Sequence, residues 1–209
     1  MIVQGTDEWR AARLGKVTAS RVADVIARTK TGWGASRANY MAELIAERLT
    51  GVPADSYTNA AMQWGIDNEA FARAAYEFRT GEDVEPASFV QHRLIEMAGA
   101  SPDGYVGTHG LVEIKCPNTA THIDTLLTGT VPAKYVTQMQ WQMECTGRLW
   151  CDFVSFDPRM PESMRLFVSR VKRDDTTIMT LFENVVLFLK ELDDKLNQLV
   201  ALYERENAA

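Results

Sequence analysis

The chain has 209 residues and a composition ordinary for a globular protein, so it is long enough to bury one large core. It has no apolar run long enough to span a membrane and no signal pattern at its N-terminus, so we expect a cytoplasmic protein with one domain over residues 1–209. Cys116, Cys145 and Cys151 have no paired ligand spacing, which argues against disulfides and against zinc or iron–sulfur sites.

Charge is distributed unevenly along the chain. The net charge is −6, yet residues 9–37 include seven basic residues and one acid. A second basic segment, residues 159–173, has five basic residues and one acid. This asymmetry predicts a positive working surface on an acidic body, as binding to a polyanion requires, although the solvated faces of basic helices would produce the same pattern.

The first part of the chain predicts helices. Capping residues and apolar periodicity indicate helices over residues 6–15, 18–27, 36–50 and 59–78, with N-caps at Thr6, at Thr18 or Ser20, at Ser36 and at Asn59. Two glycines that flank Trp33 predict a loop over residues 29–36.

The period of the apolar pattern changes after residue 81. Strands are expected over residues 84–92, 96–100, 110–115, 149–156 and 166–171, and helices over residues 119–127 and 132–145. Asp174 is expected to cap a long terminal helix whose apolar stripe is either core or subunit interface. This order predicts an α/β fold with a mixed central sheet of about five strands flanked by helices.

The segment from Ser101 to Lys115 is the strongest candidate for chemistry. A Pro-Asp-Gly turn signature around Asp103 precedes a strand that ends in Glu113-Ile114-Lys115. Side chains at i and i+2 of a strand share a face, so Glu113 and Lys115 project together, and a hairpin would bring Asp103 beside them. Two carboxylates and an ammonium in one small volume suit a divalent metal that activates water. The alternative is that these residues form only a turn and a strand, because neither the Pro-Asp-Gly signature nor an acidic residue two positions before a lysine requires a catalytic role.

Two predicted helices add candidates. Glu69 has small and apolar neighbours on its helix face, which makes it a possible third carboxylate, but an ion pair with Arg73 at i+4 is the alternative. Tyr135 and Gln138 lie three residues apart on one helix face and are candidates to position a water or a phosphate. Lys115 is a candidate to orient the attacking water or to lower its pKa.

Taken in order, these motifs resemble those of the phage alkaline exonucleases, the lambda-exonuclease-like family of YqaJ-like viral recombinases. The resemblance covers nearly the whole chain. It rests on Trp9…Arg13-Leu-Gly…Thr18-Ala-Ser20, Trp64-Gly65…Glu69, Ser101-Pro-Asp103-Gly, Glu113-Ile-Lys115-Cys-Pro, Tyr135-x-x-Gln138-x-Gln140 and Asp157-Pro-Arg159-Met160.

The resemblance implies a type II restriction-endonuclease-like core and a Mg²⁺-dependent exonuclease, with Mn²⁺ as a possible substitute. Such enzymes digest one strand of duplex DNA in the 5′ to 3′ direction from a 5′-phosphorylated end. They leave a 3′ single-stranded overhang for recombination by strand annealing. They form ring-shaped homotrimers around the DNA, and we expect a phage-type single-strand annealing protein as partner and no membrane.

The resemblance also implies a role for each matched residue. Asp103, Glu113 and the Ile114 carbonyl would bind metal, Lys115 would be catalytic, Glu69 would hold a second metal or its water, and Gln138 would lie at the active site. Arg13, with Thr18 and Ser20, would bind the 5′-phosphate. The expected DNA contacts are Met62, Lys30, Trp33 and Tyr135, with Met62 as an apolar wedge.

Two other functions remain open from the sequence. An endonuclease could have the same fold and the same carboxylates. A DNA-end-binding scaffold for an annealing protein could keep the basic surface and lack catalysis. The lysine beside two carboxylates favours an enzyme, because a binding protein has no use for it.

Overall fold

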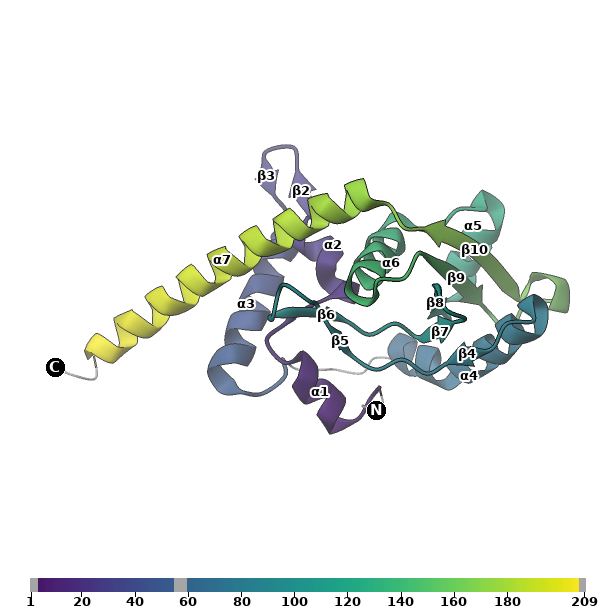
Figure 1. Ribbon diagram of the computed structural model, residues 1–209, viewed down its shortest axis with the longest axis horizontal. Helices are drawn as coiled ribbons and strands as arrows, with labels where there is room; N and C mark the ends of the chain where they lie inside the picture. The colour runs from purple at the N-terminus through teal and green to yellow at the C-terminus, as the bar shows by residue number, and fades with distance from the viewer. Residues whose placement is uncertain (1–3, 55–59, 207–209) are drawn as a thin grey trace.

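A five-stranded mixed sheet forms the centre of the protein in a computed structural model that describes residues 4–54 and 60–206 (Figure 1). The strand order is β10-β9-β8-β7-β4, and only the β8–β9 pair is parallel. The strands are β4 (Val84–Glu85), β7 (Gly104–Val106), β8 (Gly110–Lys115), β9 (Trp150–Phe156) and β10 (Leu166–Lys172). This arrangement confirms the predicted α/β class with a mixed sheet of five strands.

Two helices cover opposite faces of this sheet. On one face α4 (Ala60–Thr80) packs Ala72 and Tyr76 against Val112 and Val154. On the other face α6 (Ala133–Thr146) packs Met139 and Met143 into a cluster with Leu111, Cys151 and Phe153. Because strand side chains alternate between faces, Glu113 points to the α6 side, between the buried residues Val112 and Ile114 of the α4 side.

A second core lies beside the large sheet. It joins α3 (Ala35–Thr50), α2 (Val22–Val25), part of α6 and the first half of α7 (Asp175–Glu206) with a small sheet of order β1-β6-β5. The strands of this sheet are β1 (Val17–Thr18), β5 (Val90–Gln91) and β6 (Ala98–Ala100). The apolar stripe predicted for the terminal helix, which is α7, belongs to this core as far as Leu192. Leu199 is exposed, where α7 extends past the rest of the chain (Figure 1).

The remaining elements lie at the periphery. Helix α1 (Asp7–Arg13) is capped by Thr6, and α5 (Thr119–Thr128) connects β8 to α6. Strands β2 (Arg28–Thr29) and β3 (Gly32–Trp33) form a hairpin that projects from the body beyond α7 (Figure 1). Among the described residues, every helix is too short or too polar to cross a membrane.

The predicted strand over residues 84–92 is wrong, because this segment belongs to two sheets. Val84–Glu85 pairs with β7 of the large sheet, and Val90–Gln91 pairs with β6 of the small one. Pro86 lies between them and has no N–H to donate to either ladder. The change of sheet therefore follows a residue that ends a strand.

The Pro-Asp-Gly signature does not form the expected turn. Gly104 begins β7, a strand absent from the sequence prediction, and the chain reverses at Gly107, whose φ is +51°. A Cβ at Gly104 would collide with the Val84 side chain and would lie 3.2 Å from Val112. Glycine is needed here for close packing of three strands, not for turning.

The N-terminal boundaries also differ from the prediction. The predicted loop over residues 29–36 contains the β2–β3 hairpin, which is closed by Gly34 N–H donating to Ala27 O at 2.8 Å. Gly34 rather than Ser36 is therefore the N-cap of α3. Residues 18–27 form a 3₁₀ turn, Ala19–Arg21, followed by the four-residue α2. The predicted cap Asn59 lies outside the described residues.

Candidate active site

The β7–β8 hairpin places Asp103 beside Glu113. Gly104 pairs with Val112, so one more step in this antiparallel register puts Asp103 opposite Glu113. The Ile114 N–H donates to Asp103 Oδ2 at 2.6 Å, which fixes the carboxylate against the edge of β8. The convergence predicted from strand spacing is thus present, although a different turn produces it.

Three cationic or amide donors surround the fully buried Glu113. Gln138 Nε2 donates to Oε1 at 2.6 Å, and Lys115 Nζ forms an ion pair with the same oxygen. Gln142, one turn further along α6, donates its Nε2 to Oε2 at 2.6 Å. Sequence reasoning selected Gln138 and missed Gln142. The available signal was a second glutamine at i+4, on the same helix face.

Lys115 is a protonated cation in this site. Burial alone would lower the pKa of Lys115, but the charges of Glu113 and Asp103 outweigh it and raise that pKa above its ordinary value. The ammonium also lies 5.4 Å from the ring centroid of Tyr135, within the range of a cation–π contact. In this arrangement Lys115 offers a positive charge and N–H donors rather than a lone pair that could accept a proton.

The carboxylates carry more negative charge than Lys115 offsets. Burial raises the pKa of Asp103 well above its ordinary value, and the charges of Glu113 and Glu69 raise it further against the opposing charge of Lys115. A cation would relieve this repulsion, and oxygen donors suit a hard ion such as Mg²⁺. Within residues 4–54 and 60–206, no three acidic, histidine or cysteine side chains converge to hold a metal. Mg²⁺ fits nonetheless, because it keeps several waters and needs one or two carboxylates.

Glu69 lies close enough to influence Asp103 but is paired elsewhere. Its Oε1 accepts from Arg73 Nη2 at 3.1 Å, which is the i+4 ion pair that the sequence allowed as an alternative. The same Nη2 lies 3.3 Å from the backbone oxygen of Asp103. Arg73 therefore ties α4 to the hairpin, and the Glu69 carboxylate remains half-exposed at the edge of the site.

A second cluster lies two residues before Asp103. Arg13 Nη1 and Trp9 Nε1 both donate to Ser101 Oγ, at 3.1 and 3.0 Å, and the Arg13 guanidinium stacks 4.0 Å from the Trp9 ring centroid. A serine oxygen accepts two hydrogen bonds, so the Ser101 hydroxyl proton is available to a further acceptor. Burial lowers the pKa of Arg13 against the opposing effects of Tyr40 and Glu47. A partly desolvated arginine next to a free hydroxyl donor is suited to an oxyanion.

Thr18 and Ser20 flank the same strand end. Their hydroxyl oxygens lie 3.5 Å apart, and β1 pairs in parallel with β6, with Thr18 next to Gly99. Ser101 follows β6 directly, so the two predicted hydroxyl residues and Arg13 gather around the end of this strand. Sequence reasoning missed Ser101 and Trp9 as members of the cluster, since 88 and 92 residues separate Ser101 from its partners.

The four predicted DNA contacts occupy three places. Lys30 is exposed in the β2–β3 hairpin, and Trp33 is held between the guanidiniums of Arg28 and Arg37, 3.9 and 4.0 Å from its ring centroid. Met62 is half-exposed on α4, two turns before Glu69 on the same helix face. Tyr135 lies at the site itself, against Lys115.

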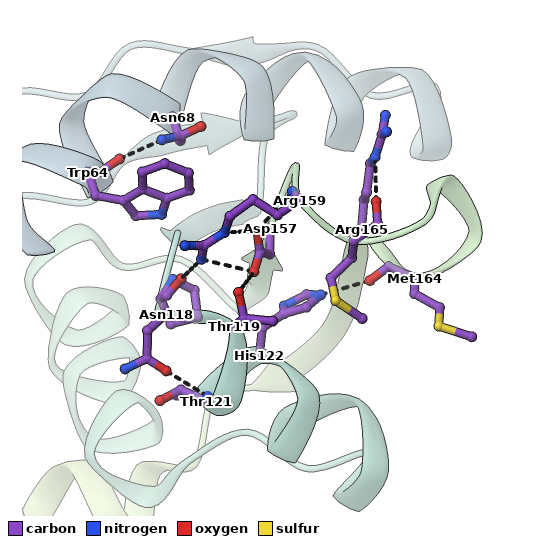
Figure 2. Close-up of polar contacts among 12 residues, drawn as sticks. Trp64, Asn68, Asn118, Thr119, Thr121, His122, Asp157, Arg159, Met164 and Arg165 are labelled. Carbon is purple, nitrogen blue, oxygen red and sulfur yellow. Dashed lines mark hydrogen bonds and ion pairs between the residues drawn. The ribbon is translucent and has the colours of Figure 1, made fainter.

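The Asp157-Pro-Arg159 motif forms a brace next to the site (Figure 2). The Asp157 carboxylate is fully buried and accepts from Thr119 Oγ1 at 2.7 Å and from Arg159 Nε at 2.8 Å. Arg159 also stacks 4.2 Å from the ring centroid of Trp64 in α4 and lies 3.4 Å from Pro117 O. This brace connects α4, close to Glu69, with the segment that follows Lys115.

Comparisons with known proteins agree with this geometry. The YqaJ-like viral recombinase domain matches residues 8–149. Two crystal structures of the alkaline exonuclease LHK-Exo from Laribacter hongkongensis, one in complex with dAMP, are 53% identical to this chain. They cover 96% of this chain and 99% of their own, with TM-scores of 0.89 and 0.90. A comparison with curated proteins found no match.

A more distant structure supports the fold alone. The phage related exonuclease from Haemophilus somnus 129PT is 19% identical over 88% of this chain and 96% of its own, with a TM-score of 0.73. The resemblance seen in the motifs is thereby confirmed, and the restriction-endonuclease-like core with it. The chain belongs to the YqaJ-like viral recombinase family and, within it, to the enzymes of the alkaline exonuclease group.

Proposed function

We propose that this chain is a Mg²⁺-dependent exodeoxyribonuclease that degrades one strand of linear duplex DNA from a 5′-phosphorylated end. It moves in the 5′ to 3′ direction and leaves a 3′ overhang for strand annealing. The observation that carries the proposal is the adjacency of two clusters: the Arg13–Ser101 pair and the Asp103–Glu113–Lys115 group are joined through Pro102.

The adjacency sets where the cut falls. Ser101 and Asp103 are two positions apart, with Pro102 between them, which is a chain length of about 7 Å at most. A terminal phosphate held by Arg13 and the Ser101 hydroxyl therefore brings the first internucleotide linkage to the carboxylates. An end without a phosphate lacks this anchor, which accounts for a preference for phosphorylated ends.

Each residue has a role in hydrolysis. Asp103 and Glu113, with the Ile114 carbonyl, would hold Mg²⁺ or Mn²⁺, which supplies charge neutralisation at the phosphodiester and a more acidic water. Lys115 adds a fixed positive charge and N–H donors next to the same phosphate. Gln138 keeps Glu113 in place through its amide. Glu69 can approach the site only by changing its pairing with Arg73.

The binding surface would read the DNA backbone. Lys30 and Trp33 extend on the projecting hairpin, Met62 offers an apolar side chain for the terminal base pair, and Tyr135 closes the site. Backbone contacts carry no sequence information, so digestion would be independent of sequence. A homotrimeric ring around the duplex would make it processive, and an annealing protein would take up the exposed strand. We further propose that the enzyme acts on DNA in the cytoplasm.

Three substrates test the proposal. The full-length protein with Mg²⁺ is incubated with linear duplex bearing 5′-phosphates, the same duplex bearing 5′-hydroxyls, and a covalently closed circle. We expect rapid loss of one strand from the phosphorylated duplex, slow loss from the hydroxyl duplex, and an intact circle. Cutting of the circle would identify an endonuclease instead, and end binding without any digestion would identify a scaffold.

A further inference from the structure

Gln142 has an unusual environment on α6. It is fully buried, and its Nε2 donates to Glu113 Oε2 at 2.6 Å. Its other amide atom, Oε1, is also buried and has no hydrogen-bond partner in the part of the chain that the structure describes. An unsatisfied buried carbonyl destabilises a fold, so packing alone does not explain a glutamine at this position.

The chemistry of Glu113 dictates the orientation of this amide. An ionised carboxylate only accepts hydrogen bonds, so the amide must present Nε2 to Glu113, and its buried Oε1 then has no hydrogen-bond partner among the described residues. Methionine has a similar volume and would avoid the buried carbonyl. Gln142 therefore lowers the stability of the fold through its unsatisfied carbonyl, and the one side-chain hydrogen bond that it forms within the described part of the chain is with a predicted metal ligand.

The three donors leave Glu113 little freedom. A carboxylate offers about four lone-pair positions, two on each oxygen. Gln138 and Lys115 both contact Oε1, and Gln142 occupies one position on Oε2. One position then remains, and it is on Oε2. Gln138 and Lys115 hold Oε1 and Gln142 holds Oε2, so a rotation of the carboxylate that would present both oxygens to a cation disturbs all three contacts, the bond to Gln142 included.

We infer that Gln142 is a positioning residue that, together with Gln138 and Lys115, holds Glu113 as a one-oxygen ligand and thereby favours Mg²⁺ and Mn²⁺ over Ca²⁺. This inference rests on the metal-dependent function proposed above. Ca²⁺ takes six to eight oxygens and readily uses both oxygens of a carboxylate, whereas Mg²⁺ requires a near-ideal octahedron of six. Restricting Glu113 to one oxygen removes a donor that Ca²⁺ uses and Mg²⁺ does not need.

Metal binding to the full-length protein without DNA tests this role. Affinities for Mg²⁺ and Ca²⁺ are measured by titration calorimetry, and for Mn²⁺ by electron paramagnetic resonance. Gln142→Met removes the donor, and Gln142→Asn withdraws the amide by one methylene in case the first variant does not fold. We expect each to weaken Mg²⁺ binding by about tenfold and to reduce the ratio of the Ca²⁺ to the Mg²⁺ dissociation constant.

Gln140 provides the matched control. It is also buried on α6, but its Nε2 donates to Lys172 O at 2.8 Å and its Oε1 accepts from Asp174 N at 2.9 Å. Gln140→Met therefore loses two buried hydrogen bonds away from Glu113. It should lower the melting temperature at least as much as Gln142→Met and leave the metal affinities within about twofold, since it touches no ligand.

The outcomes separate the two proposals. The positioning role would be overturned if the folded Gln142 variants bound Mg²⁺ as tightly as the wild-type protein and kept the wild-type ratio of the Ca²⁺ to the Mg²⁺ dissociation constant. Equal weakening by Gln140→Met would also overturn it, because the effect would then be a loss of general stability. Failure of the wild-type protein to bind Mg²⁺ or Mn²⁺ would instead overturn the proposed metal-dependent function.

Discussion

Arg13 Nη1 donates to Ser101 Oγ at 3.1 Å, two residues before the carboxylate of Asp103. This contact joins α1 to the connection between the two sheets, across 88 residues of sequence. It places the arginine that we propose as the phosphate anchor next to the carboxylates that we propose as metal ligands. The relationship gives the proposed exonuclease a way to hold a strand end and to cut beside it.

Removal of the arginine should therefore affect end selection. We expect Arg13→Ala, and to a smaller degree Ser101→Ala, to lower the preference for 5′-phosphate over 5′-hydroxyl ends by about tenfold or more, since a hydrogen bond to a charged group contributes about 1.5–3 kcal/mol. Initial rates on the two duplexes measure this preference. Arg10→Ala is the control, because Arg10 on the same helix pairs with Asp7 at 2.7 Å. An unchanged preference in Arg13→Ala would place the phosphate site elsewhere.

Lys115 should be required for hydrolysis and dispensable for end binding. Lys115→Ala removes the cation paired with Glu113, and we expect kcat to fall on the order of 10²–10³-fold, as for loss of a group that stabilises transition-state charge. The dissociation constant for a duplex end, measured by fluorescence anisotropy, should change little. Lys134→Ala is the matched control: its Nζ lies 4.7 Å from the ring centroid of Tyr135, and the residue contributes to a cation–π contact rather than to the Glu113 pair. Substantial activity in Lys115→Ala would remove this role.

Gly104 should be needed for the geometry of the hairpin. Gly104→Ala introduces a methyl group against Val84, and overpacking of this kind typically costs about 1–3 kcal/mol in the free energy of unfolding. Because Asp103 is the preceding residue, exonuclease activity should fall as well. The double variant Gly104→Ala/Val84→Ala creates room for the methyl and should recover part of both losses in urea unfolding and activity assays. If Val84→Ala gives no recovery, the collision with Val84 is not the cause.

Asp157 should make stability depend on acid pH. Burial would raise the pKa of Asp157, but hydrogen bonds from Arg159 and Thr119 lower it from 3.8 to about 2. The folded state therefore holds the ionised form, so this contribution to stability is complete above pH 3.8 and is lost as the pH falls toward about 2. Urea unfolding at pH 5 and at pH 3 should show that Asp157→Asn destabilises the protein more at pH 5.

Thr119→Val offers a graded comparison for this effect. Thr119→Val removes one donor to Asp157. It should therefore reduce, without abolishing, the difference in the free energy of unfolding between pH 5 and pH 3. A pH dependence identical in the wild-type protein and in Asp157→Asn would show that other carboxylates dominate acid unfolding. Activity is not needed as a readout here, since the brace in Figure 2 contacts α4 and the segment after Lys115 rather than the carboxylates of the site.

Local sequence determined most of the long helices and strands and, within β8 and α6, the face that each candidate side chain occupies. The two-residue period of β8 placed Glu113 and Lys115 together, and the helical period of α6 placed Tyr135 and Gln138 on one face. Motif order was sufficient to indicate the family, which the comparisons confirm. These features depend on neighbours within about one helical turn or one strand, so a sequence contains them directly.

Tertiary structure alone decided which distant segments meet. The sequence left Glu69 open between a metal and Arg73, and the fold pairs it with Arg73. It contained no local signal that Ser101 meets Arg13 or that Gly104 packs against Val84, and although Pro86 marks a break within residues 84–92, only the fold shows that the two parts join different sheets. Such contacts depend on how whole layers pack, because burial and strand pairing join residues with no periodic relation in sequence.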